Sequence, residues 1–473
     1  MGGSRNMAQS HGKTYEIDMC SGAILPKLLQ FTVPLMCSSV LQLLFNAADI
    51  IVVGRFAGDN SLAAVGSNSS IIALLTNLFI GLSVGANILA ARFFGANDRE
   101  SLSQTVHTSM LISLLSGIFL AIAGACGART ILVWMQTPSN VLDLATLYLR
   151  IYFLGMPATM LYNFGAALLR AVGDTRRPLY FLLTAGIVNV ILNLFFVIVC
   201  SLDVAGVALA TVISQCISGF LVVLCMIRET GAVHLDLRKL HIWPVRLKQI
   251  LQTGLPAGFQ GILFALSNVV IQSSINSFGE TIMAGNAAAA NLENFIYVSL
   301  NAFYQGNISF TSQNLGAGKL DRIPKILHCA QLCVLVLGTF LGVLAALFGP
   351  QLLGIYSQSP DVISAGMDRL LIVGITYAIC GLMDTTVGSL RGIGYSVLPM
   401  LVTLIGACGL RILIVATLFQ VPGFHTVQTV YWSYPISWTL TFLAHICCYC
   451  WAFRRVRRHL TEPSSPSIAS PEK

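Results

Sequence analysis

The residues of this 473-residue chain best suited to chemistry are a few acids set inside long apolar runs. Asp49 is the clearest of them, since Gln42 and Asn46 precede it at helical spacing and share its face of a helix. If the run crosses a membrane, a buried carboxylate costs about 2.5–3.5 kcal/mol, so it is retained mainly for a function. We interpret Asp49 as a cation or proton site, with a purely structural polar contact as the alternative.

Two further acids, Glu293 and Asp384, are second-rank candidates for the same role or for a cavity wall. Glu293 also begins a stripe of polar residues that recur at every fourth position, so they share one helix face. Such a face either lines a central cavity or binds a neighbouring helix. Phe264 would add an aromatic surface for flat cations, or simply pack. The stripe comprises Glu293, Tyr297, Asn301 and Gln305.

Composition places these residues in a membrane protein. Hydrophobic residues make up 55% of the chain and charged residues only 10%, against about 25% charged in ordinary soluble domains. The mean hydropathy is +0.78. So few charges exclude a disordered chain, a coiled coil and a nucleic-acid-binding protein.

A bilayer core requires about 20 apolar residues per helix, and the chain supplies such a run twelve times. The fold class we predict is therefore all-α and integral to the membrane, with twelve transmembrane helices in two pseudo-symmetric six-helix bundles. The spans are expected at residues 28–54, 62–91, 103–125, 144–169, 178–200, 205–227, 251–277, 282–310, 326–348, 363–388, 397–419 and 429–452.

The positions of the basic residues predict the orientation. Most of the 27 Lys and Arg residues fall in segments that share one side, which places both termini in the cytoplasm. The one long polar break divides the chain into six spans and six spans. We expect a cytoplasmic N-terminal segment, an N-terminal lobe, a cytoplasmic linker, a C-terminal lobe and a disordered cytoplasmic tail, at residues 1–25, 26–228, 229–248, 249–453 and 454–473.

The two halves repeat each other. LLRAVGDTRRP at 168–178 superposes on SLRGIGYSVLP at 389–399 with a constant shift of 221, which places Arg170 on Arg391 and Gly173 on Gly394. Six spans return the chain to its starting side, so the repeat is parallel, with its axis along the membrane normal. Such a repeat, with substrate handled between the halves, is typical of transporters.

Motifs for other functions are missing from the sequence. There is no GxxxxGK[ST] phosphate loop, no HExxH and no GxSxG with triad partners. The 13 cysteines lie mostly in apolar runs, without the spacing of a metal site or a disulfide framework. We therefore expect no enzyme, no cofactor and no structural metal.

The sequence resembles the multidrug and toxic compound extrusion (MATE) family of cation-coupled antiporters. The two halves, the paired RAVGD and RGIGY loops and GVALATVISQ at 206–215 carry the resemblance, which covers residues 25–453. It implies export of cationic or other amphipathic drugs and xenobiotics through alternating access of two lobes, in exchange for H⁺ or Na⁺.

The resemblance also implies roles for single residues. Asp49 matches the acid of the first helix that takes the coupling ion, Asn189 an amide beside it, and Thr211 a hydroxyl of the sixth helix. Asn193 is a departure, because several members have Asp there. Phe264 stands where a Na⁺-coupled subgroup has Glu, and Asp384 is about one turn from that subgroup's other acid. These departures favour protons over sodium.

Two other functions remain open. A lipid-linked oligosaccharide flippase of the same broad superfamily would carry more cations in its cavity than Arg150, Arg369 and Arg411 provide. A channel or receptor without coupling is disfavoured by the repeat. We expect a monomer in a plasma membrane, bacterial by its resemblance, whose partners are the bilayer and a small amphipathic or cationic substrate, with no nucleic acid.

Overall fold

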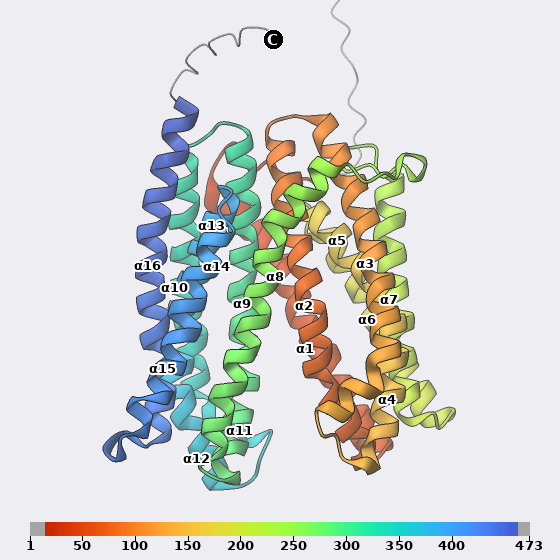
Figure 1. Cartoon of the computed structure of the whole chain (residues 1–473), viewed down its shortest axis with the longest axis vertical. Coiled ribbons are helices and arrows are strands. Elements are labelled where there is room, and N and C mark those ends of the chain that lie inside the picture. Colours follow the sequence, from red (N-terminus) through yellow and green to blue (C-terminus); the bar gives the residue numbers. More distant parts are fainter. Residues whose placement is uncertain (1–14, 462–473) are drawn as a thin grey trace, which may run out of the picture.

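The structure, a computed structural model, describes residues 15–461, and within that range it is helical without strands. Two helical bundles stand side by side (Figure 1). The first contains α1 (Ile24–Phe56), α2 (Asp59–Gly95), α3 (Arg99–Trp134), α4 (Ser139–Leu154), α5 (Met156–Ala171), α6 (Arg176–Leu194), the π-helical η1 (Phe195–Val199) and α7 (Asp203–Arg228).

The second bundle repeats this order after a linker with one 3₁₀ turn, η2 (Leu237–Lys239). Its first spans are α8 (Pro244–Asn276), α9 (Glu280–Gly316) and α10 (Arg322–Leu347). The remaining elements are α11 (Gly349–Gly354), α12 (Pro360–Arg369), η3 (Leu370–Gly374), α13 (Ile375–Gly392), α14 (Val397–Thr403), η4 (Leu404–Gly409), α15 (Leu410–Ala416), the short η5 (Leu418–Gln420) and η6 (Pro422–Phe424), and α16 (Val427–Thr461).

The expected twelve spans and two bundles are confirmed, although hydropathy alone finds fewer. Ten described helices are long and apolar enough to cross a membrane, and an eleventh span is the pair α4 and α5, bent by 47°. That bend lies at Gly155, two residues before Pro157, which cannot donate a backbone hydrogen bond. The span that hydropathy misses is α9, because its polar stripe lowers the apolar average of an otherwise long helix.

The expected disordered tail at 454–473 begins too early. Helix α16 continues through the basic sequence RRVRRH to Thr461. Arg is a good helix former, and cations near a helix C-terminus interact favourably with the helix dipole. The rest of the expected tail, 462–473, lies outside the described residues, as does 1–14 of the expected N-terminal segment.

The two bundles meet where α2 crosses α8. Gly81 and Gly85 of α2 face Gly258 and Gly254 of α8, so closely that a Cβ on any of them would overlap backbone atoms of the partner helix. Small residues allow such an approach between helices in a membrane, where packing rather than the hydrophobic effect holds helices together. The sequence spacing GxxxG on both helices therefore has a packing function here.

A second crossing joins the bundles at the end where α1 begins and α16 ends, called the terminal end below (Figure 1). Gly95 of α2 and Gly316 of α9, 221 residues apart, pack reciprocally on each other's helix backbone. The bonds beside them follow the same pseudo-twofold relation. Arg92 Nη2 donates to the Gly392 carbonyl (3.4 Å), and Gln313 Nε2 donates to the Ala171 carbonyl (2.6 Å).

The chain before α1 closes the same seam. Ile17 packs its backbone on Gly173 of the first bundle, whose φ of +96° suits glycine. Two residues later Met19 is fully buried, and its carbonyl accepts from Asn314 Nδ2 of the second bundle (3.1 Å). Lys319 Nζ donates to the carbonyl of Cys20 (2.9 Å). Residues 17–20 therefore tie the two bundles together.

All hydrogen bonds between the bundles within 15–461 lie toward the terminal end. They include the bonds of Arg92 and Gln313, the bonds between residues 17–22 and the second bundle, and the bond from Ser309 to Asn87. The linker and the start of α8 also bond to α3 there. At the opposite end, called the far end, α2 and α8 diverge (Figure 1). The described structure is thus held closed at the terminal end alone.

The glycine crossing gives a first prediction. Gly258→Val places a branched side chain against the α2 backbone, so overpacking should destabilise the protein by roughly 1–3 kcal/mol. Gly261→Val, one turn along α8, is the matched control, since a Cβ there lies 3.6 Å from Asn77, an ordinary contact. The midpoint of thermal unfolding in detergent should fall for Gly258→Val only. Equal midpoints for the two variants would contradict the crossing.

Candidate functional site

The first candidate site lies inside the first bundle, between α1, α6 and α7. Asn193 Nδ2 of α6 donates a short hydrogen bond to Asp49 Oδ1 of α1. Asp49 is half-buried, whereas Asn193 is almost fully buried. The structure thus brings together two residues 144 apart in sequence, and within 15–461 no ion pair involves Asp49.

A ladder of neutral groups extends this contact. Asn193 Nδ2 also lies 3.4 Å from Asn189 Oδ1, and Asn189 Nδ2 lies 3.5 Å from Thr211 Oγ1 on α7. Thr211 in turn donates to the Val207 carbonyl (3.0 Å). All four residues assigned to coupling from the sequence, Asp49, Asn189, Asn193 and Thr211, therefore form one connected cluster.

The amide of Asn193 suits a carboxyl group that changes its charge. Its Oδ1 is buried without a hydrogen-bond partner in the described structure. Amide oxygen and nitrogen can exchange places by rotation. Nδ2 donates to an ionised Asp49, whereas after rotation Oδ1 accepts from a protonated Asp49. Both protonation states can thus be bonded without moving a helix.

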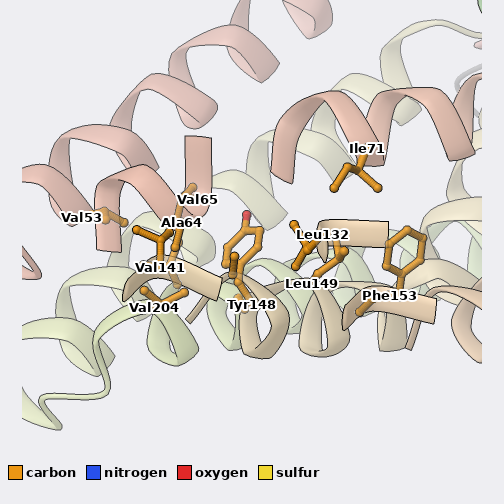
Figure 2. Close-up of a cluster of buried hydrophobic side chains, with 14 of the residues drawn as sticks. Val53, Ala64, Val65, Ile71, Leu132, Val141, Tyr148, Leu149, Phe153 and Val204 are labelled. Carbon is orange, nitrogen blue, oxygen red and sulfur yellow. The ribbon is translucent and has the colours of Figure 1, made fainter. Parts of the chain in front are cut away.

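Packing fixes the distance between α1 and α6 at this site. The Phe45 ring, one turn before Asp49, lies directly on Gly186, one turn before Asn189. A Cβ on Gly186 would overlap that ring. One turn after Asp49, Val53 joins a buried apolar cluster with Tyr148 of α4 (Figure 2). Asp49 is therefore held between two packed layers.

The polar residues expected beside Asp49 on α1 behave differently. Gln42 and Asn46 are exposed, and neither makes a hydrogen bond with Asp49 in the described structure. Their helical spacing does place them on the same side of α1, but Asp49 lies where α6 covers the helix. Gln42 and Asn46 do not belong to the ladder.

The residues of the stripe on α9 lie in two different surroundings. Tyr297 is 37% exposed, and Asn301 and Gln305 are half-buried and joined by a hydrogen bond of 3.0 Å. Gln305 also borders a very small cavity between the bundles together with Arg170 and Asn87. This part of the stripe is available to a cavity.

Glu293, by contrast, binds a neighbouring helix. Its two carboxylate oxygens accept from Arg369 Nε (2.9 Å) and Nη2 (2.7 Å), and both side chains are buried. Arg369 Nη1 also donates to Asn286 (2.7 Å). A bidentate pair of this kind holds the charge of Glu293 in place. Of the two interpretations left open by the sequence, Glu293 fits the second, a contact with a neighbouring helix; its partner Arg369 lies 76 residues away along the chain.

Asp384 on α13 is half-buried and makes no hydrogen bond or ion pair within 15–461. Two turns on, Arg391 is already engaged, donating to Tyr304 and to Gln260 Oε1 (2.7 Å). Asp384 is thus the one acid of the second bundle's interior without a bonded partner among the described residues. It stays a candidate for the cavity wall.

Phe264 packs on an arginine that the sequence analysis left without a role. The Arg411 guanidinium lies 6.0 Å from the Phe264 ring, 4.3 Å from Tyr434 and 5.3 Å from Trp438. Phe264 is therefore engaged inside the second bundle. The position of Arg411 inside an apolar span could have marked it as a buried charge. Its aromatic partners could not be predicted from the spacing of residues along the sequence.

An apolar cavity of about 470 Å³ opens between α1, α9 and α10. Ser299 is the only polar residue that borders it. The lining residues are Met36, Cys37, Val40, Leu41, Ser299, Leu337 and Leu341. Within 15–461, no group of three His, Cys, Asp or Glu side chains could hold a metal ion.

The comparison with protein families decides the identity of this architecture. The MatE family model matches residues 34–195 and 256–417, one copy in each bundle. The chain belongs to the MATE family. The two matched segments are offset by 222 residues, in agreement with the internal repeat. MATE proteins are transporters, so this chain is not an enzyme.

Other MATE-like chains share both sequence and fold. The chain is 27% identical over 390 residues to the probable multidrug resistance protein YoeA of Bacillus subtilis, covering 81% of this chain and 84% of that one. It is 27% identical over 397 residues to YpnP of the same species, also a probable multidrug resistance protein, covering 83% and 88%. A solved outward-facing multidrug resistance MATE transporter superposes with a TM-score of 0.85 at 20% identity, covering 93% and 98%.

The buried ion pair of this MATE protein gives a second prediction. Arg369→Met leaves the Glu293 carboxylate buried without a cation, which should cost about 3–5 kcal/mol of stability. The double variant Arg369→Met/Glu293→Leu should recover most of that loss, because no charge remains unpaired. Arg129→Met is the control, since it breaks an exposed pair with Asp143 worth about 1 kcal/mol or less.

Unfolding midpoints of the four proteins in the same detergent measure these differences. A double variant as unstable as Arg369→Met would show that the arginine stabilises the bundle by packing rather than by pairing with Glu293.

Proposed function

We propose that this MATE protein is a secondary exporter of amphipathic or cationic drugs, driven by protons that enter through Asp49. The single observation that carries the proposal is the partner of Asp49, a neutral amide rather than an arginine. A carboxylate opposite a fixed cation keeps its charge, whereas one opposite an amide is free to exchange a proton or to hold a cation in turn. The names of the multidrug-resistance relatives support the direction of transport.

The terminal end is the cytoplasmic end in this proposal. The basic segments that favour the inside lie there, among them the linker before α8 and the end of α16. With bonds between the lobes confined to this end, the described structure corresponds to a state closed to the cytoplasm. Export then requires the two six-helix lobes, residues 26–228 and 249–453, to rock until the far end closes and the terminal end opens.

Protons are favoured over sodium as the coupling ion by the set of oxygen ligands. The ladder offers one carboxylate, Asp49, with Asn193 where several family members have a second acid. The second lobe offers no alternative, because Glu293 is paired and Phe264 packs on Arg411. A single carboxylate is enough to bind and release a proton, whereas a cation held here would have one negatively charged ligand fewer than in members with a second acid.

The driving force is sufficient for such exchange. One proton entering across 100 mV contributes about 2.3 kcal/mol. That energy supports a gradient of a neutral substrate of roughly fifty-fold, because about 1.4 kcal/mol corresponds to a factor of ten. Exchange of one proton for one monovalent cation moves no net charge, so such a substrate would be driven by the pH difference alone.

The substrate would lie between the lobes, against α9 and α13. Tyr297 and Asp384 supply an aromatic face and an unpaired carboxylate, and Asn301 with Gln305 supplies hydrogen-bonding groups. Together they suit amphipathic cations of varied shape, with no cofactor, in a monomer embedded in the plasma membrane.

Efflux from vesicles tests the coupling. Purified protein is reconstituted in proteoliposomes loaded with ethidium, and pH and sodium gradients are imposed separately. We expect efflux with the pH gradient only. Asp49→Asn should lower its rate at least tenfold, because an amide cannot carry the proton, while Asn193→Leu should lower it less.

Asp143→Asn is the matched control, because this acid is exposed and bonded only to Arg129. It should transport as wild type does. Efflux driven by a sodium gradient alone would show that Na⁺, not H⁺, is the coupling ion. Full activity of Asp49→Asn would show that the coupling site lies elsewhere, and Asp384 would be the next acid to test.

A further inference from the structure

The second lobe contains a buried charge that the proposed transport cycle does not use. Arg411 is 1% exposed and is the largest fully buried side chain of the described structure. It follows directly on the π-helical turn η4, an irregular segment of a kind that often accompanies functional sites. Within 15–461 no acid forms an ion pair with it.

The guanidinium also lacks hydrogen-bond acceptors. Of its five N–H groups, only Nε–H has an acceptor in the described structure, the Ser437 hydroxyl at 2.9 Å. Its Nη2 is buried without one. The rings of Tyr434, Trp438 and Phe264 attract the positive charge through their faces, but a ring face does not satisfy four N–H groups.

A second unpaired donor lies beside Arg411. Trp438 Nε1, on a ring 5.3 Å from the guanidinium, is buried without an acceptor. Buried polar groups are normally bonded, so two orphaned donors at one buried cation indicate an acceptor that they share.

The acids of the lobe's interior do not pair with Arg411. They are Glu293 of α9 and, in the span from Pro360 to Gly392, Asp368 and Asp384. Glu293 is engaged by Arg369, Asp368 accepts from Gln428 Nε2 (3.2 Å), and Asp384 forms no ion pair in the described structure. Arg411 is therefore a buried cation without a bonded acid within 15–461, which a low-dielectric medium penalises.

We propose that a small monovalent anion, of which chloride is the available example, binds between α8, α15 and α16 against Arg411. The anion supplies the two things that the guanidinium lacks, a negative charge and an acceptor for its N–H groups. Its donors are Arg411 Nη2 and Trp438 Nε1. The site is separate from the Asp49 ladder, which lies in the other lobe.

Anion-dependent stability of the full chain in detergent is the test. Sodium chloride is titrated against sodium gluconate at constant ionic strength, and the unfolding midpoint is recorded. Binding to the folded state alone should raise the midpoint saturably, by about 2–4 °C. The rise should disappear in Arg411→Gln and persist in Asp384→Asn.

Crystals grown in bromide supply a readout that needs no variant. An anomalous peak in contact with the Arg411 guanidinium is the expected result, and it covers the case in which Arg411→Gln fails to fold. Equal midpoints of the wild type in chloride and gluconate would overturn the proposal. So would a chloride effect retained in Arg411→Gln, or one that appears only in Asp384→Asn, which would make Asp384 the counter-ion of Arg411.

Discussion

A charge inside a bilayer must be neutralised, paired or given a route to water, and this requirement distinguishes the surroundings of two acids of the described structure. Glu293 is paired with Arg369 by two hydrogen bonds, which makes it part of the scaffold. Asp49 has only the amide of Asn193. The difference between those two partners separates an acid fixed by an arginine from the acid that we propose as the coupling site, although both residues appear in the sequence as lone acids in apolar helices.

The glycine crossings determine what the lobes can do relative to each other. At Gly95 and Gly316 the helix backbones touch. Arg92 and Gln313 each donate to a carbonyl at a helix end of the other lobe, and the pseudo-twofold relation maps one bond onto the other. The seam does not consist of glycines alone, because α1 and α9 share a buried apolar cluster in which the rings of Phe31 and Phe310 lie 5.8 Å apart. A change of tilt between the lobes therefore has to separate or slide both kinds of contact.

The sequence predicts the helices well and their side-chain partners poorly, for a physical reason. Apolar length and turn residues are local properties, so all twelve spans follow from them, including the polar α9 that an average hydropathy misses. The Asp49 ladder was reached through helical spacing and family resemblance. The bond between Glu293 and Arg369 joins helices 76 residues apart, and no local pattern specifies it. The helical end of α16 was missed because charged residues suggested disorder.

The repeat conserves architecture while the chemistry of the two lobes has diverged. In each lobe three equivalent helices enclose a polar centre: α1, α6 and α7 around Asp49, and α8, α15 and α16 around Arg411. The first centre holds an acid whose charge can change, and the second an arginine, which remains charged at any physiological pH. In the proposed mechanism only the first responds to a proton gradient. On that proposal the two lobes of one fold have unequal tasks, since the first exchanges the coupling proton and the second keeps a constant charge.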